Sequence, residues 1–109
     1  GGSKSGLWRQ ILADVFQLPV CTTGGAAEVA ADKAMGVKKG VPDLCLPVTR
    51  GGFHGLYIEM KTPGGRASDA QRWWMMELTK QGYRAVVCHG YDAAVAELCW
   101  YLSLPKEVR

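Results

Sequence analysis

The chain has 109 residues and a mass of 11.8 kDa, which suffices for one domain and excludes a multidomain machine. Hydrophobic residues make up 48% of the chain and charged residues 21%, so the composition excludes disorder over most of its length. No apolar run approaches the roughly 20 residues that cross a bilayer, so we expect a soluble, intracellular protein with no membrane partner.

The two ends of the chain are expected to lie outside the folded unit. Gly1-Gly2-Ser3 has the composition of a cleaved expression tag, and no hydrophobic signal region follows it. We therefore interpret residues 1–5 as a tag remnant or disordered segment, residues 6–104 as a single domain and residues 105–109 as a frayed tail.

The four cysteines form no Cys-x-x-Cys pair, which argues against a zinc site. Three of them, Cys45, Cys88 and Cys99, lie within apolar runs and are expected in the core, where a free thiol behaves as a small apolar residue. Free thiols fit a reducing cytoplasm.

The net charge of +3 is unevenly distributed along the chain. The segment from Lys38 to Arg72 holds six cations and three anions, whereas the remaining residues hold seven of each. All the excess positive charge therefore lies in one central third, which is also rich in glycine. A basic, loop-rich centre indicates a polyanionic partner.

In chain order, the sequence first predicts two helices. An apolar stripe at i, i+3, i+4 and i+7 predicts an amphipathic helix over residues 6–17, ending before Pro19. A short strand or turn follows at residues 19–23. The alanine-rich run Ala26 to Met35 then predicts a second helix that ends at Gly36.

The rest of the chain predicts three strands and two helices. Pro42 and Pro47 bracket a short strand, which forms a hairpin with residues 56–62 through a turn at 49–55. A capping box at Ser68 and Gln71 opens a helix over residues 68–81, closed by Gly82. A buried strand at 83–88 and a helix capped by Asp92 and running to Ser103 complete the order α-α-β-β-α-β-α. This order predicts an α/β fold with a small mixed sheet flanked by helices.

Two acidic residues and a lysine are expected to meet at one end of the hairpin. Side chains alternate along a strand, so Glu59 and Lys61 share one face, and Asp43 at the start of the neighbouring strand reaches the same end. Two carboxylates beside a lysine suit Mg²⁺, which meets substrate phosphates and activates water for phosphodiester cleavage. The alternative is that Glu59 and Lys61 form an ion pair on an exposed strand.

The same residues carry a resemblance to a known nuclease family. Pro42-Asp43, followed sixteen residues after the aspartate by Glu59-Met60-Lys61, resembles the PD-(D/E)xK nuclease signature. The flanking residues resemble the virus-type replication-repair nuclease (VRR-NUC) family in its short, stand-alone phage and bacterial form. The similar segments are Lys39 to Leu44, Gly55 to Thr62, Arg66 to Gln71 and Gly82 to Arg84, within a match over most of the chain from about Gly36 to Leu102.

The resemblance implies a restriction-endonuclease-like core and Mg²⁺- or Mn²⁺-dependent cleavage of branched DNA, four-way (Holliday) junctions in particular. It also implies a nucleoid-associated protein in the cytoplasm of a bacterial or phage-infected cell. Asp43 and Glu59 match the metal-binding acids, Lys61 the catalytic lysine and the backbone carbonyl of Met60 a further metal ligand. Gln71 matches a glutamine of the following helix, and a role there is compatible with its role in the capping box.

The sequence departs from the family pattern near its beginning. Family members often carry a metal-binding glutamate on an early helix, but the first helix here offers only Asp14, which lies off the apolar stripe and is expected to face water. Glu28 on the second predicted helix is therefore our candidate for that ligand. A longer native N-terminus is the other possible source.

Four cations on loops beside the acids are predicted to contact DNA phosphates, the alternative being that they only solubilise the chain. They are Lys38, Lys39, Arg50 and Arg66. His54 is interpreted as an exposed turn residue.

Trp73 and Met76 point away from the predicted core face of their helix, so either another helix of the chain covers them or they form a homodimer interface. The last helix, with Trp100 and Tyr101 on different faces, is a second candidate surface. The rival functions are a flap-directed, end-directed or duplex nuclease of the same superfamily, and a DNA-binding module without catalysis.

Overall fold

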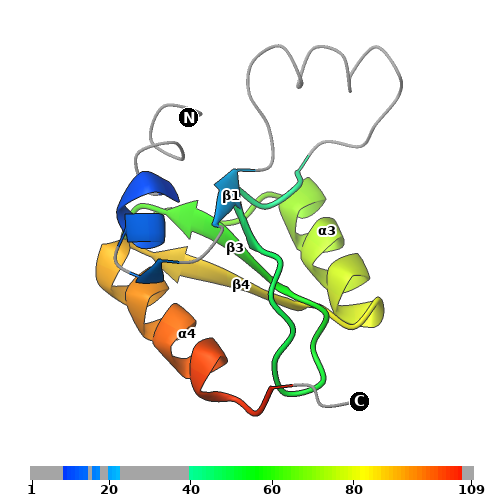
Figure 1. Cartoon of the computed structure of the whole chain (residues 1–109). Coiled ribbons are helices and arrows are strands. Elements are labelled where there is room, and N and C mark those ends of the chain that lie inside the picture. The colour runs from blue at the N-terminus through cyan, green and yellow to red at the C-terminus, as the bar shows by residue number, and fades with distance from the viewer. Residues whose placement is uncertain (1–8, 15, 18–19, 23–39, 107–109) are drawn as a thin grey trace.

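The computed structural model describes residues 9–14, 16–17, 20–22 and 40–106 (Figure 1). Residues 9–14 are helical. The named elements that follow are β1 (Cys21–Thr22), β2 (Leu44–Leu46), β3 (Leu56–Lys61), α3 (Asp69–Lys80), β4 (Arg84–His89) and α4 (Tyr91–Ser103). The predicted α/β class with a small mixed sheet is confirmed, whereas the helix predicted over residues 26–35 lies outside the described residues.

The four strands form one sheet in the order β1-β2-β3-β4. β2 pairs antiparallel with both β1 and β3, and its register with β3 joins Leu44 to Ile58. β3 and β4 are parallel, with Lys61 opposite His89. The start of β2 therefore meets the ends of β3 and β4 at one edge of the sheet, which we call the carboxyl edge.

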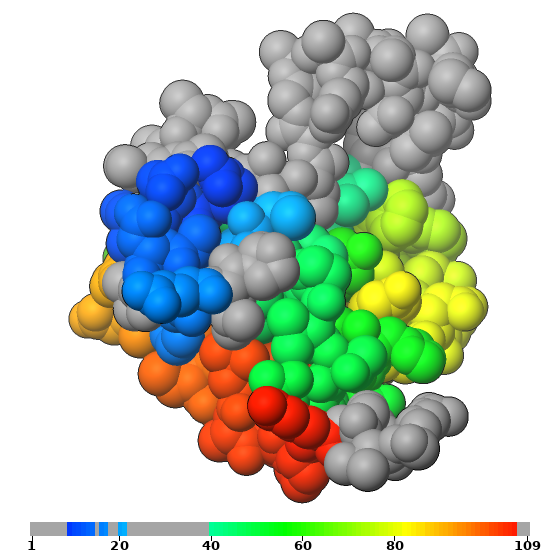
Figure 2. All heavy atoms as spheres, in the orientation of Figure 1, coloured from blue at the N-terminus to red at the C-terminus, as the bar shows by residue number. Residues whose placement is uncertain are grey.

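The turn between β2 and β3 forms the opposite, far edge of the sheet. Gly51 and Gly52 adopt positive φ angles of 56° and 88°, which glycine adopts without a steric penalty. The hydroxyl of Tyr101 donates to the carbonyl of Val48 at 2.6 Å, and the amide of Gly51 donates to the carbonyl of Pro105 at 2.8 Å. In Figure 2 the red C-terminal residues accordingly lie against the green hairpin. The C-terminal end of the described chain thus braces the far edge.

The hydrophobic core lies between the sheet and α4. α4 buries Ala94, Leu98 and Tyr101, an i, i+4, i+7 stripe that packs in one cluster with buried side chains of the strands and of the N-terminal helix. The other members of this cluster are Leu12, Val20, Leu44, Leu46, Leu56, Ile58 and Cys88. Each large aliphatic side chain buried there contributes about 1.5–3 kcal/mol to stability.

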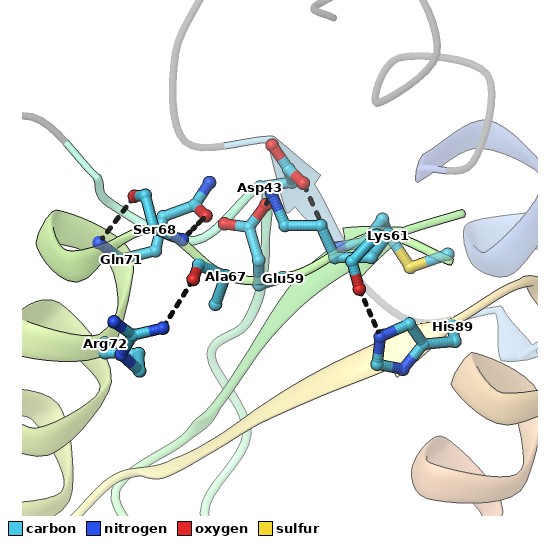
Figure 3. A network of polar contacts seen from close by, with 10 residues as sticks. Asp43, Glu59, Lys61, Ala67, Ser68, Gln71, Arg72 and His89 are labelled. Carbon is cyan, nitrogen blue, oxygen red and sulfur yellow. Dashed lines mark hydrogen bonds and ion pairs between the residues drawn. The ribbon is translucent and has the colours of Figure 1, made fainter. Parts of the chain in front are cut away.

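α3 covers the other face of the sheet, as Figures 1 and 3 show, and none of its residues is fully buried. Its ends carry the predicted signals. Ser68 accepts from the amide of Gln71, whose side chain accepts from the amide of Ser68, so the capping box is confirmed. At the other end Gly82 has a φ of 93°, and the amides of Gly82 and Tyr83 donate to the carbonyls of Thr79 and Leu78, the bonding pattern of a Schellman motif.

Three local expectations are wrong. α4 has Gly90 rather than Asp92 at its N-cap, and Asp92 lies in the first turn, where its charge favours the helix dipole. Cys99 is exposed because the buried stripe of α4 passes through its neighbour Leu98. β4 buries only Cys88, because the strand stands last in the sheet order and has one neighbouring strand. None of the helices in the described ranges has the length and apolarity of a membrane span.

Candidate active site

Asp43, Glu59 and Lys61 meet at the carboxyl edge, on the face of the sheet that α3 covers (Figure 3). Since Leu44 pairs with Ile58, Asp43 stands level with Glu59 across the β2–β3 ladder. One carboxylate oxygen of Asp43 accepts from the amide of Met60 at 3.0 Å. Nζ of Lys61 lies 3.5 Å from Oε2 of Glu59. The register of the β2–β3 hairpin therefore brings the three residues together, with no contribution from a loop distant in sequence.

Glu59 is the one buried charged residue among those described, with 3% of its surface exposed. The ion pair with Lys61 thus exists, but the alternative of a pair on an exposed strand is wrong because the carboxylate is buried. Oε1 of Glu59 is buried with no hydrogen-bond partner in the described protein. An unsatisfied buried acceptor costs about 1–3 kcal/mol, and more when it is charged. The protein therefore keeps a costly acceptor at this point.

Burial, and after it the adjacent Asp43, raises the pKa of Glu59 from 4.5 to about 8, whereas Lys61 partly offsets both effects. Two carboxyl groups held together in a low-dielectric site cannot both carry a charge at little cost. A cation bound between them would stabilise both ionised forms. The electrostatics of the site thus favour an additional positive charge beside the one that Lys61 supplies.

The donor set fits a divalent cation. Asp43 and Glu59 offer hard carboxylate oxygens, and the orphaned Oε1 of Glu59 is a ready ligand. No group of three His, Cys, Asp or Glu side chains that could hold a metal ion occurs within the described ranges. Mg²⁺ suits this set, because it accepts two carboxylates and a carbonyl, here that of Met60, and keeps several waters. The additional acid that we placed at Glu28 lies outside the described residues.

Of the remaining candidate residues, the structure describes Gln71, Arg66 and Arg50. Gln71 caps α3 close to the acids and its side-chain oxygen is used in the capping box. Arg66 lies on the loop that follows Lys61 and is exposed to solvent. Arg50 lies in the hairpin turn at the far edge, so the expectation that it flanks the acids is wrong: the antiparallel register sends the turn to the opposite end of β3. Lys38 and Lys39 lie outside the described residues.

Two residues that the sequence analysis did not single out also lie close to the site. Gly40 has a φ of 105°, and a Cβ there would lie 2.6 Å from the backbone carbon of Ala70, so the chain leading to Asp43 packs directly on the first turn of α3. His89 ends β4 opposite Lys61. A sequence signal existed for His89, because the end of a parallel strand beside a catalytic strand lies at the ligand-binding edge of a sheet. No sequence signal distinguished Gly40 from the other glycines.

Trp73 and Met76 are exposed on α3, with 37% and 54% of their surfaces accessible, as the helical periodicity predicts. Trp73 contacts Trp74 edge to face. On α4, Trp100 is 44% exposed and lies under the guanidinium of Arg84, whereas Tyr101 is fully buried. Large apolar surface is therefore accessible on both helices.

Comparisons with known proteins agree with this geometry. The family model described as the VRR-NUC domain matches residues 7–92. A solved structure named "VRR_NUC domain protein" superposes with a TM-score of 0.71 at 38% identity, over 80% of this chain and 70% of that one. No curated protein matches. The chain therefore belongs to the VRR-NUC family, which makes it a nuclease of the PD-(D/E)xK type that acts on DNA.

Proposed function

We propose that the chain is a Mg²⁺- or Mn²⁺-dependent endonuclease that cleaves phosphodiester bonds in branched DNA, with Asp43, Glu59 and Lys61 as its catalytic residues. The observation that carries the proposal is the buried Glu59 carboxylate with its orphaned Oε1, next to Asp43 and 3.5 Å from Lys61. A stability role alone does not explain a buried carboxylate oxygen that is kept without a hydrogen-bond partner.

Each residue has a separate chemical role in this proposal. Asp43 and Glu59 hold the cation, together with the carbonyl of Met60, and Glu28 is the proposed source of a further ligand. The cation supplies Lewis acidity and lowers the pKa of bound water. Lys61 holds the attacking water or stabilises the negative charge that develops on the phosphate. Gln71 and the cations Arg66, Lys38 and Lys39, the last two outside the described residues, orient the DNA backbone in this proposal.

The test is cleavage of labelled DNA with Mg²⁺, with Mn²⁺ and with EDTA. Asp43→Ala, Glu59→Ala and Lys61→Ala are each expected to abolish cleavage while leaving the fold intact by circular dichroism. The two carboxylate variants also lose Mn²⁺ binding in calorimetry, whereas Lys61→Ala retains it. Substantial cleavage by Glu59→Ala at saturating Mg²⁺ would place the active site elsewhere.

We further propose that the active species is a homodimer that resolves four-way junctions. One chain supplies one catalytic centre, whereas a four-way junction requires two cuts on strands related by approximate twofold symmetry. The outer face of α3 carries Trp73 and Met76, which are exposed apolar residues of the kind enriched in interfaces.

Light scattering is expected to report about twice the 11.8 kDa mass of the chain. Met76→Glu should yield a monomer that no longer makes paired, symmetric cuts. Trp100→Glu tests the second candidate surface, on α4, and is expected to leave the dimer intact. A wild-type monomer that makes paired cuts would refute the dimer, and a monomer that cuts only flaps would make one-sided repair intermediates the substrate.

A further inference from the structure

A histidine outside the proposed catalytic group lies at the carboxyl edge beside Lys61. β4 places His89 opposite Lys61, and the next amide, that of Gly90, donates to the carbonyl of Lys61 at 3.0 Å. Nε2 of His89 lies 2.9 Å from the carbonyl oxygen of Gly65, so the ring donates a hydrogen bond when Nε2 carries its proton. Figure 3 shows this bond reaching from β4 toward the strand that bears Lys61.

The loop over residues 62–67 folds back on the lysine. The amide of Gly65 donates to the carbonyl of Thr62 at 2.9 Å, which closes a tight turn. A Cβ on Gly65 would lie 3.2 Å from Oγ1 of Thr62 and 3.4 Å from Cβ of Lys61, so the turn packs directly against the catalytic lysine. His89 fixes this turn from the β4 side.

α3 holds the other end of the same loop. Nη1 of Arg72 donates to the carbonyl of Ala67 at 2.7 Å, and the capping box at Ser68 follows immediately. The carbonyls on both sides of Arg66, those of Gly65 and Ala67, are therefore each held by a side chain from a different element (Figure 3). Hydrogen bonds on both sides therefore hold the backbone of Arg66 in place, although the loop is short and exposed.

The charge of Arg66 is available to an anion. Three other exposed or half-exposed cations each have a carboxylate partner: Arg72 with Asp69, Lys80 with Glu77 and Arg84 with Glu97. Within the described residues, Arg66 has no ion pair and no side-chain hydrogen bond. A guanidinium on a clamped backbone next to a phosphodiester site is suited to bind a phosphate oxygen.

We propose that His89 is a positioning residue: its bond to Gly65 holds the 62–67 loop so that Arg66 binds a DNA phosphate beside the acids. The inference rests on the proposed nuclease site. Because His89 acts through Arg66, its loss affects substrate binding and not the chemical step.

The test measures KM and kcat for His89→Ala with Mg²⁺ and labelled DNA, together with the affinity for the same DNA by fluorescence anisotropy with EDTA. Loss of one hydrogen bond is expected to raise KM about three- to tenfold while kcat changes by less than about twofold. His89→Gln keeps a side-chain N–H donor and should recover most of the loss. A fall in kcat with KM unchanged would refute the proposal.

The double variant His89→Ala, Arg66→Ala tests the route of the effect. If His89 acts through Arg66, it should raise KM no further than Arg66→Ala alone, because coupled residues are not additive. Fully additive losses would refute the route. His54→Ala is the matched control, because this other histidine of the chain lies in the turn at the far edge and its loss should leave KM unchanged.

Hydrogen exchange separates this inference from the proposed function. The Gly65 amide is expected to exchange faster in His89→Ala than in the wild type, with no DNA present, and the same exchange in both would refute the anchoring. If wild-type protein cleaves no DNA with either metal, the proposed function fails. The inference then still stands or falls on the loop exchange and on the DNA affinity of the His89 and Arg66 variants.

Discussion

Gly40→Ala tests whether the approach of the chain to α3 positions Asp43. An alanine at a φ of 105° is strained, which costs about 1–3 kcal/mol. Its Cβ would also lie 2.6 Å from the backbone carbon and 2.8 Å from the oxygen of Ala70, so the backbone on one side must move. Displacing a packed element costs about 1–3 kcal/mol more.

The two costs sum to about 2–6 kcal/mol, a large part of the roughly 5–15 kcal/mol that stabilises a typical domain. The assay is urea unfolding followed by tryptophan fluorescence, with Mn²⁺ affinity measured in parallel. We expect lower unfolding free energy and weaker Mn²⁺ binding, because Asp43 follows Gly40 by three residues and would shift with it.

Two other glycines provide matched controls. Gly90 has a similar φ of 96°, but a Cβ added there would have nothing within 4 Å, so Gly90→Ala carries the strain without the collision. Gly64 has open space and no positive φ, so Gly64→Ala should change little. Equal losses in Gly40→Ala and Gly90→Ala would show that the close approach to α3 contributes nothing, and the positioning argument would fail.

Three further predictions concern charge and capping. With EDTA present, the pKa of Glu59 is about 8 in the folded protein and 4.5 in the unfolded chain. The free energy of unfolding should therefore fall as the pH rises from 5 to 8.5, because the unfolded chain releases a proton that the folded protein still holds. Glu59→Gln should remove this pH dependence in thermal unfolding. An equal slope in both proteins would refute the shift. Arg66→Ala should weaken binding to all DNA forms and flatten the dependence of affinity on salt, measured by anisotropy; an unchanged slope would leave Arg66 a solubilising charge. Ser68→Ala should lower the free energy of unfolding in urea by about 0.5–2 kcal/mol, because it removes the N-cap hydrogen bond to the amide of Gln71. Thr79→Ala, at an exposed hydroxyl that only donates to the carbonyl of Met75, should lower it less.

The sequence was informative wherever a local rule decides the structure. The capping box, the glycine after α3 and the two prolines around β2 are each read within a few residues, and the hairpin that they imply brings Asp43 level with Glu59. The family resemblance was correct for the same reason, since its residues lie on that hairpin and the helix after it.

The sequence was uninformative where distant segments meet. The burial of Glu59 cannot be read from a Glu-x-Lys spacing, and neither can the close approach of Gly40 to Ala70 of α3. Arg50 was misplaced because closeness in sequence to the acids does not show at which end of a hairpin a residue lies. His89 was missed because its contact with Gly65 joins the end of β4 to the loop after β3, two segments that only the parallel pairing of these strands brings together.

The far-edge turn, which touches none of the proposed catalytic residues, determines whether they can function together. A shift of one residue in the β2–β3 pairing would turn Glu59 toward α4 and bring an apolar neighbour to the carboxyl edge. β2 has only three residues, so few hydrogen bonds of its own resist such a shift. The turn therefore fixes the β2–β3 register on which the arrangement of the site depends. It does so through the positive φ angles of Gly51 and Gly52 and through its hydrogen bonds to Tyr101 and Pro105. An insertion that shifted this turn would therefore inactivate the nuclease from the end of the sheet opposite the proposed catalytic residues.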